Sequence, residues 1–201
     1  MARYRGHYLH HRGNELGLLL PRQRVPNYSL QGQTSARLDF HPVNEADFAE
    51  WLPFYHDPRS SAHWAYASAE EPAVRCQQWF ASQRYREANQ LGGLNTLREK
   101  GNGALVGYCG LLVQTVDGLP ELEIGYSLLP SHWGRGYATE AALTCKAFAC
   151  THHLSESVIS IISLTNVASQ RVALNLGMRV EKVTWYAANE VSIFRVTLDA
   201  G

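Results

Sequence analysis

The sequence lacks several patterns that would assign it to a functional class at once. Its 18 lysine and arginine residues equal its 18 aspartate and glutamate residues, so the formal net charge is zero. A surface that binds nucleic acid by charge alone needs an excess of basic residues. No apolar run approaches the roughly 18 residues of a membrane span, and no secretory signal is evident. We therefore expect neither a nucleic-acid partner nor a membrane partner.

The cysteines also lack the spacing of a metal or redox motif. Cys76, Cys109, Cys145 and Cys150 form no Cys-x-x-Cys pair and no zinc-like cluster with histidine. Each lies in an apolar stretch, which is typical of thiols packed in a core. The histidine-rich start, residues 7–11, is too irregular to indicate a metal site. The sequence predicts no metal, and a reducing, cytoplasmic compartment is the default expectation.

What the sequence does contain is apolar material for one domain and an uneven distribution of charge. Hydrophobic residues make up 45% of the 201 residues, which excludes wholesale disorder. Residues 1–33 carry a net charge of +4 without sustained periodicity, whereas residues 34–201 carry −4. We expect a basic N-terminal arm at 1–33, either flexible or covering the body or a partner subunit, and one domain at 34–201.

Residues 34–201 show the alternation of an α+β domain, with a central mixed, mostly antiparallel β-sheet flanked by helices. The predicted strands are 37–41, 94–99, 104–116, 121–129, 158–164, 178–186 and 191–198. The predicted helices are one capped by Asn44 that ends before Asp57, then 72–91, 136–151 and 166–176, with a loop at 57–71. Asp117-Gly118 indicates a tight hairpin turn, which requires antiparallel neighbours.

The segment 121–142 is the most informative one for chemistry. A predicted strand leads into a turn that contains Gly134 and Gly136, and an alanine-rich helix follows. Glycine lets backbone N–H groups approach an anion, and the helix start adds the positive end of its dipole. Arg135 can add charge, and the small Ala138 allows close approach. The turn predicts a pyrophosphate site, although an ordinary tight turn explains it equally well and neither a P-loop nor a G-x-G-x-x-G motif is present.

Together with its flanks, this segment resembles the GNAT superfamily of acetyl-CoA-dependent N-acetyltransferases. The family pattern at the turn is Arg/Gln-x-x-Gly-x-Gly/Ala, and residues 133–138 match it except that Trp133 replaces the Arg or Gln. The strings Glu-Ile-Gly-Tyr at 123–126 and Trp-Gly-Arg-Gly-Tyr-Ala-Thr-Glu-Ala at 133–141 are similar to the RimJ/RimL branch. The segments 34–47 and 166–178 also resemble that branch, so the likeness covers about 34–198.

The resemblance implies the GNAT fold and transfer of an acetyl group from acetyl-CoA to a primary amine by direct attack in a ternary complex. The acceptor would be a protein N-terminal α-amine or a small-molecule amine, and a homodimer is compatible with the family. The alternative is a non-catalytic acyl-CoA-binding or regulatory module, which Trp133 favours. The resemblance assigns cofactor binding to Leu128, Leu129, Trp133, Gly134, Arg135, Gly136, Tyr137, Ala138, Thr139 and Asn166.

Glu123 is the residue that the resemblance implies as general base, acting through a water, and burial would raise its pKa. Glu121 is the alternative, because residues two apart share one face of a strand. The acceptor pocket would lie between the early helices and the last strands. Its candidate wall residues are Trp64, Tyr66, Trp185 and Tyr186, and His63 and His132 are weaker candidates for a base.

The oxyanion and the leaving thiolate need hydrogen-bond donors. The resemblance implies a backbone N–H near Ser127, just after Gly125, in a strand that contains a bulge. It implies Ser169 as the acid facing the thiolate, one helical turn after Asn166, and Tyr137 is the alternative. An ordinary helix cap at Asn166 and a surface serine at Ser169 would explain the same pattern without chemistry.

Overall fold

The computed structural model of the protein describes residues 26–63 and 70–198. Its elements are β1 (Leu38–His41), η1 (Glu45–Asp47), α1 (Phe48–His56), α2 (Pro58–Ser61), α3 (Pro72–Ala88), β2 (Gly92–Glu99), β3 (Leu105–Val116), β4 (Leu119–Leu128), η2 (Pro130–His132), α4 (Tyr137–Thr151), β5 (Ser157–Ser163), α5 (Val167–Asn175), β6 (Arg179–Tyr186) and β7 (Asn189–Thr197). The predicted α+β class is confirmed.

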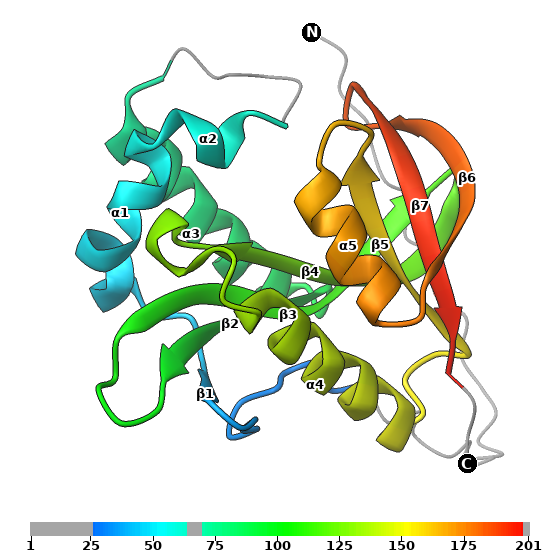
Figure 1. Ribbon diagram of the computed structural model, residues 1–201, viewed down its shortest axis with the longest axis horizontal. Coiled ribbons are helices and arrows are strands. Elements are labelled where there is room, and N and C mark those ends of the chain that lie inside the picture. The colour runs from blue at the N-terminus through cyan, green and yellow to red at the C-terminus, as the bar shows by residue number, and fades with distance from the viewer. Residues whose placement is uncertain (1–25, 64–69, 199–201) are drawn as a thin grey trace, which may run out of the picture.

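The strands form one seven-stranded sheet in the order β1-β2-β3-β4-β5-β7-β6. All neighbours are antiparallel except β4 and β5, which run parallel, so the predicted mixed sheet is confirmed. A single residue pair, Glu123 and Ile159, joins β4 to β5. The two strands separate beyond that pair, which divides the sheet into two halves that meet at Glu123 (Figure 1).

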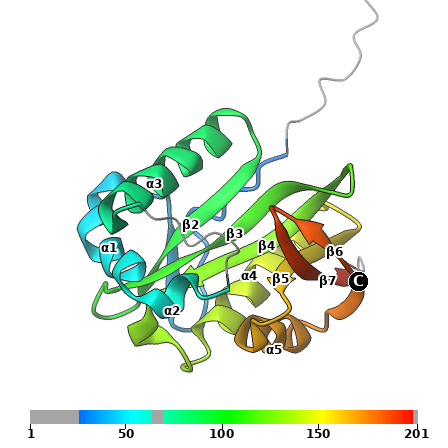
Figure 2. The same ribbon diagram turned by 90° about the horizontal axis from the view of Figure 1, so that it is seen from above.

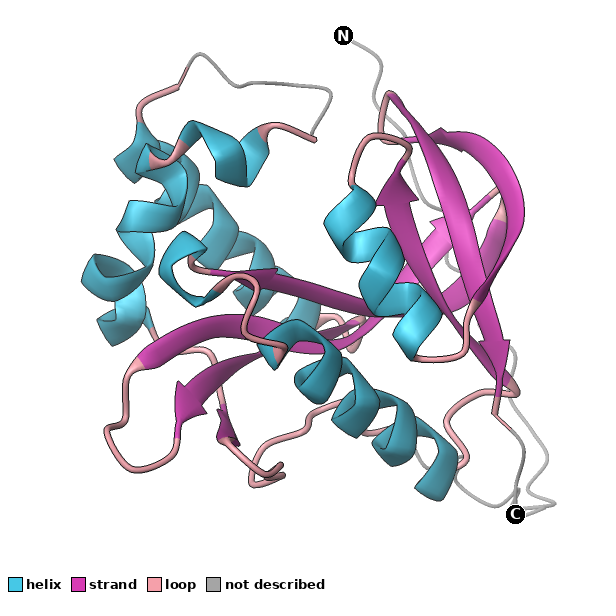
Figure 3. Ribbon diagram, in the orientation of Figure 1, coloured by secondary structure: helices cyan, strands magenta, loops and turns pink. Residues whose placement is uncertain are grey.

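Helices cover both faces of the sheet (Figures 2 and 3). On one face, α1 and α3 pack over an aromatic core that includes Trp51, Phe80 and Tyr108. On the other face, α4 covers β3 and β4, where Leu122 and Ile124 are buried. Because side chains alternate along a strand, the odd-numbered residues of β4 face the α1/α3 side.

Residues 26–33 belong to the folded body, although the sequence assigns them to the arm. Leu30 is fully buried in the core beneath α4, and Tyr28 packs against that core. Backbone hydrogen bonds of 3.0 Å join Gly32 and Gln33 to Phe40, at the start of the sheet. The arm interpretation therefore concerns only residues 1–25, which lie outside the described residues.

The predicted loop at 57–71 is wrong in its first part. Asp57 caps a short helix, α2, because its carboxylate accepts the Arg59 N–H at 2.9 Å and Pro58 occupies the first turn. The predicted helix 72–91 ends earlier, at Ala88, where Asn89 caps it and Gln90 has a φ of 56°. The tight turn at Asp117-Gly118 is confirmed, with φ values of 49° and 81°.

The bulge expected near Gly125 is not found in the ladder between β3 and β4, both of which are described in full. The two strands pair without a register shift from Gly107–Leu128 to Val116–Leu119. Gly125 has a packing reason instead: a Cβ there would lie 2.4 Å from Leu112 Cδ1. The glycine therefore makes room for the leucine of the neighbouring strand.

All four cysteines are free, and Cys109 and Cys145 lie with their Sγ atoms 3.5 Å apart in the core between β3 and α4. Within the described residues, no group of three or more His, Cys, Asp or Glu side chains gathers as a metal site would require. No helix in that part of the chain combines the length and apolarity of a membrane span.

Candidate active site

Residues 133–139, here called the glycine turn, comprise the connection between η2 and α4 and the first residues of α4. Gly134 and Gly136 have φ values of 72° and 81°, a conformation that costs other residues about 1–2 kcal/mol each. α4 begins directly afterwards at Tyr137, and Gly136 makes no side-chain cap. The first N–H groups of this 15-residue helix therefore lack partners within the helix. Left-handed residues followed by a helix start make a concave site for an anion.

Contacts from the segment just before β1 hold the glycine turn in place. Arg37 donates from Nη1 to the Arg135 carbonyl at 2.9 Å and from Nε to the Glu140 carboxylate at 2.7 Å. The Ser35 hydroxyl donates to the same carboxylate at 2.6 Å. The sequence motif includes Glu140, but the sequence assigns it no role because its partners lie about a hundred residues earlier.

Tyr137 packs inside the turn. Its ring is buried, the Arg37 guanidinium lies 4.3 Å from the ring centroid, and its hydroxyl donates to the Glu99 carboxylate. Arg135 also pairs with Glu99, at 3.4 Å. The Tyr137 hydroxyl is therefore engaged beneath the turn, which argues against Tyr137 as the alternative acid.

Trp133 connects the turn to the end of β4. Its indole N–H donates to the Leu128 carbonyl at 2.8 Å, and its ring lies 5.5 Å from the Arg59 guanidinium. The Leu129 N–H donates to the Val106 carbonyl at 3.0 Å. Two of the peptide groups that the sequence assigns to the cofactor arm, the Leu128 carbonyl and the Leu129 N–H, are thus already bonded within the protein.

Where β4 and β5 separate, a cavity of about 430 Å³ opens, here called the β4–β5 cleft. Five residues that the sequence put forward line it: Glu123, Asn166 and Ser169, and the weaker candidates His63 and Tyr186. Residues that the sequence did not select also line it, among them Gln114, Ile124, Gly125, Tyr126, Ser160 and Asn189. The cleft therefore brings the predicted base and the predicted acid to one space.

Glu123 lies at the point where the two halves of the sheet meet. Its Oε2 accepts the Gln114 amide N–H at 2.7 Å, and its Oε1 lies 3.4 Å from the Ile161 N–H. Burial raises the pKa of the Glu123 carboxyl, while these hydrogen bonds and the Arg86 guanidinium oppose the rise. A carboxylate with a raised pKa in a cavity is suited to accept a proton near neutral pH.

Glu121, the alternative base, is occupied elsewhere. Arg195 of β7 binds both oxygens of its carboxylate, at 2.7 and 3.0 Å, and also binds Glu181 and Ser157. Such a bidentate pair occupies both oxygens of the carboxylate and fixes its orientation. Glu121 does not line the cleft, so the geometry favours Glu123 over Glu121.

Strand alternation changes which N–H group can serve the oxyanion. The bond from the Leu129 N–H to the Val106 carbonyl sets the pairing, so odd-numbered residues of β4 bond to β3. The Ser127 N–H therefore points toward β3, and Ser127 does not line the cleft. The N–H groups of Tyr126 and Leu128 point toward the side where β5 has moved away, and Tyr126 lines the cleft.

The start of α5 forms another wall of the cleft. Asn166 is the N-cap, since its Oδ1 accepts the Ser169 N–H at 3.0 Å, so the ordinary cap interpretation is confirmed. The Tyr126 hydroxyl donates to the Ser169 carbonyl at 3.2 Å, which joins β4 to α5. Within the described residues, the Ser169 hydroxyl has no hydrogen-bond partner, so it is free to donate into the cleft.

Another wall of the cleft is formed by His63 and the hairpin between β6 and β7. His63 Nδ1 lies 2.9 Å from the Thr165 hydroxyl, and its carbonyl accepts the Asn189 amide at 3.0 Å. The Tyr186 hydroxyl donates to Gln114 Oε1 at 3.0 Å. Of the predicted wall residues, Tyr186 lines the cleft, Trp185 is 72% exposed, and Trp64 and Tyr66 lie outside the described residues.

His132, the other histidine considered, lies in η2 beside the glycine turn. Its Nδ1 is 3.0 Å from the Ser131 hydroxyl, and its ring lies 5.9 Å from that of Tyr137. Burial lowers its pKa, and Arg135 lowers it further. It does not line the cleft.

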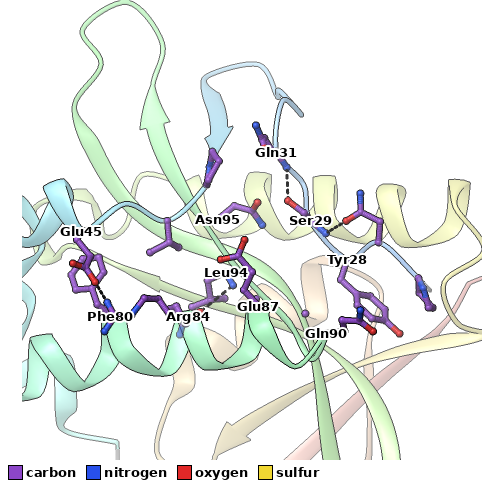
Figure 4. Close-up of a pocket in the computed structure, with 17 residues that line it drawn as sticks. Tyr28, Ser29, Gln31, Glu45, Phe80, Arg84, Glu87, Gln90, Leu94 and Asn95 are labelled. Atoms are coloured by element: carbon purple, nitrogen blue, oxygen red, sulfur yellow. Dashed lines mark hydrogen bonds and ion pairs between the residues drawn. The ribbon is translucent and has the colours of Figure 1, made fainter. Parts of the chain in front are cut away.

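A second cavity, of about 250 Å³, lies between residues 26–31, α3 and β2 (Figure 4). Its walls include Tyr28, Phe80 and Leu94, with Arg84 and Glu45 paired at its rim. β1 pairs only with residues 96–99 of β2, so this cavity lies beside the part of the β2 edge that β1 leaves unpaired. None of the residues that the sequence predicts for the site lines it.

Comparisons with known proteins agree with this fold. A family model described as acetyltransferase (GNAT) domain matches residues 37–179. The uncharacterized protein YkkB of Bacillus subtilis (strain 168) is 36% identical over 84 residues, which are 42% of this chain and 49% of that protein. The chain thus spans about half the length of that curated relative.

Solved structures of acetyltransferases show the same fold. One from Agrobacterium tumefaciens str. C58 has a TM-score of 0.70 and 23% identity, and the match covers 87% of this chain and 98% of that one. RimJ of Mycobacterium smegmatis, in complex with CoA-disulfide, has a TM-score of 0.66 and 19% identity, with 83% and 88% covered. The microcin C7 self-immunity acetyltransferase MccE, in complex with acetyl-CoA and AMP, has a TM-score of 0.68 and 12% identity, with 86% and 98% covered. The expected GNAT fold is confirmed.

Proposed function

Because the chain belongs to the GNAT acetyltransferase family, we propose that it moves an acetyl group from acetyl-CoA to a primary amine by direct attack in a ternary complex. The acceptor is a small-molecule amine or a protein N-terminal α-amine. The observation that carries the proposal is the placement of Glu123, a carboxylate with a raised pKa, in the cleft where β4 and β5 part.

The glycine turn fits the pyrophosphate of acetyl-CoA. Gly134 and Gly136 adopt the left-handed conformation that can present backbone N–H groups to an anion, and the start of α4 adds its dipole. This arrangement explains how a chain of zero net charge can hold a polyanion. The pantetheine arm would then run along β4 into the opening left by β5, where the N–H groups of Tyr126 and Leu128 have no strand beside them.

Glu123 acts as the general base in this proposal, directly or through a water. It takes a proton from the acceptor ammonium, and the free amine attacks the thioester carbonyl. The new C–N bond gives a tetrahedral oxyanion, which collapses to the amide as the C–S bond breaks. The surplus proton on the nitrogen passes to the departing sulfur, so CoA leaves as the thiol. Holding both substrates in the cleft supplies much of the rate enhancement, since the reaction then becomes effectively unimolecular.

Two donors complete the site. We assign the Tyr126 N–H, in place of the group near Ser127, as the donor that stabilises the oxyanion. Strand alternation directs the Tyr126 N–H toward the opening. Ser169 donates its hydroxyl to the departing sulfur, and Asn166, whose Oδ1 caps α5, offers its amide N–H groups to the cofactor. A serine hydroxyl is a weak acid, so we expect Ser169→Ala to lower kcat by about tenfold or less.

A thiol-release assay over a panel of amines tests the proposal. The panel includes peptides with free N-termini, amino acids, polyamines and amino sugars, and each is measured with Glu123→Gln beside the wild type. Turnover that depends on Glu123 supports the enzyme. Binding of CoA without turnover on any amine would instead support the non-catalytic acyl-CoA-binding module.

The feature that favours this module is Trp133, in the place of the family's Arg or Gln. In the structure its indole N–H bonds the end of β4, so the tryptophan supports the turn and does not disrupt it.

A further inference from the structure

Gln114 and Tyr186 form a chain of hydrogen bonds that ends on Glu123. The Tyr186 hydroxyl donates to Gln114 Oε1 at 3.0 Å, and Gln114 Nε2 donates to Glu123 Oε2 at 2.7 Å. Three separate strands, β6, β3 and β4, supply these side chains, and all three side chains line the β4–β5 cleft. Side chains from β3 and from the last hairpin are therefore linked to the carboxylate of Glu123 on β4.

The direction of the chain is set at its Glu123 end. An ionised carboxylate only accepts hydrogen bonds, so the Gln114 amide turns its N–H toward Glu123 and its oxygen toward Tyr186, whose hydroxyl donates to it. Tyr186 thus supports the orientation in which Gln114 presents a donor to Glu123. A donor suits the ionised carboxylate, which is the form that accepts a proton.

We propose that Tyr186 and Gln114 are positioning residues that hold the Glu123 carboxylate as the proton acceptor of the reaction. The inference rests on the proposed function, because it presumes that Glu123 is the base. Gln114 acts directly on Glu123, and Tyr186 acts through Gln114. Neither residue needs to touch the reacting atoms.

Other groups also lie around the Glu123 carboxylate, besides Gln114 and Tyr186. Arg86 of α3 lies close enough to lower the pKa of Glu123, although its Nη2 is bonded to the carbonyls of Leu91 and Val113 at 3.2 and 2.8 Å. The Ile161 N–H of β5 approaches the other carboxylate oxygen. His63 lines the same cleft from the segment after α2. Glu121, on the same strand, is neutralised by Arg195.

The test measures the titration of Glu123 itself, so it needs no acceptor. The full chain is labelled with ¹³C at the glutamate carboxyl groups, and the NMR signal that disappears in Glu123→Gln identifies Glu123. Gln114→Met keeps the length of the side chain without the donor, and we expect it to raise the pKa of Glu123 by about 1 unit. Tyr186→Phe should raise it by a smaller amount, because Gln114 stays in place but is free to turn.

The double variant separates a chain from two independent effects. Because Tyr186 acts through Gln114, Gln114→Met/Tyr186→Phe should titrate as Gln114→Met alone does. Tyr85→Phe, on the exposed surface of α3, is the matched control and should leave Glu123 unchanged. With an accepted amine, the acid limb of the pH profile of kcat/KM should move by the same amount as the NMR titration.

A Glu123 titration that does not move in Gln114→Met overturns the inference, as does a double variant whose shift is the sum of the single shifts. Tyr186→Phe retains the fold under both outcomes, since it removes one hydroxyl, and a Tyr186→Phe shift of zero also counts against the chain. Failure of the proposed function is seen in a different measurement, the turnover of amines. Glu123→Gln then turns over like the wild type, whatever the titrations show.

Discussion

The glycine turn is built from residues that are close together in the sequence, whereas the β4–β5 cleft is assembled from segments far apart. The turn needs little more than residues 133–139, held from beneath by Arg37 and Glu99. The cleft takes Glu123 from β4, Gln114 from β3, Ser169 from α5 and Tyr186 from β6. In the proposed function the two regions therefore have separate roles: the turn binds the cofactor, and the cleft performs the proton transfer.

The two regions also treat positive φ angles differently. The turn places glycine at φ values of 72° and 81°, where glycine costs little. The hairpin beside the cleft places Ala187 and Ala188 at 48° and 60°, where an L-residue is strained by about 1–2 kcal/mol. Strain of this kind often accumulates near functional sites.

The largest effect is expected from Glu123→Gln. The variant cannot accept a proton, so kcat/KM for the amine should fall by about 10²–10⁴-fold, the usual contribution of a general base. Binding of acetyl-CoA, measured by calorimetry, should stay unchanged because the glycine turn is intact. Glu121→Gln lies on the same strand face and should lose only a few-fold in turnover, because its carboxylate binds Arg195. A larger loss in Glu121→Gln would move the base assignment to that residue.

The next effect is expected from Gly136→Val, which affects the turn alone. Valine must adopt a left-handed conformation to form the turn, so the Kd for CoA should rise by about tenfold or more. Gly118→Val, at the same φ of 81° in the β3–β4 hairpin, is the matched control. It should lower stability by a similar amount and leave the Kd for CoA unchanged. Equal Kd values for both variants would show that the turn does not bind the cofactor.

A smaller effect concerns stability and pH. Burial raises the pKa of Glu123 in the folded state, so the folded protein holds this proton more tightly than the unfolded chain does. Its contribution to the free energy of unfolding therefore falls as pH rises from the unfolded value through the folded pKa.

Glutamine does not titrate, so Glu123→Gln does not lose free energy of unfolding as the pH rises. The variant should be more stable than the wild type at pH 8, by on the order of 1 kcal/mol. The gain should disappear near pH 4, where the carboxyl is protonated in both states. Urea unfolding at both pH values measures the difference, and a gain that does not depend on pH would contradict the account.

The smallest effect is expected from Ala188→Gly. Glycine relieves the left-handed strain but loses more entropy on folding, so the free energy of unfolding should rise by about 0.5–1 kcal/mol. Ala81→Gly, in the exposed middle of α3, should lower it by about 1 kcal/mol. Thermal unfolding of both variants checks the two opposite signs, and a loss of stability in Ala188→Gly would remove the argument for strain beside the cleft.

The glycine turn could be predicted from the sequence because its signals are local. Gly134 and Gly136 precede an alanine-rich helix, and glycine is the residue that a left-handed turn requires. The helix and strand periods predicted the α+β class, and the Asp117-Gly118 pair predicted the hairpin, because these signals are local too. The short helix α2 was missed although Asp57-Pro58 is a recognisable cap, because its four residues show no period.

The cleft could be predicted only in part, because its contacts depend on which strands are neighbours and in what register. Gln114 is a polar residue at the end of an apolar strand, which was its only signal, and its partner lies across the sheet. The pairing of β3 with β4 decides that the Tyr126 N–H, not the Ser127 N–H, faces the opening. The Ser169 assignment follows from the family resemblance together with its place one helical turn after Asn166, and it stays a prediction.

One comparison of variants tests the division between turn and cleft most directly. Turnover is measured at saturating acetyl-CoA for Glu123→Gln and Gly136→Val, beside the Kd of each for CoA. We predict that Glu123→Gln binds CoA as the wild type does but turns over about 10²–10⁴-fold more slowly, whereas Gly136→Val binds weakly yet keeps a kcat near that of the wild type. If each variant loses both binding and turnover to a similar extent, the two regions do not have separate roles and the account is contradicted.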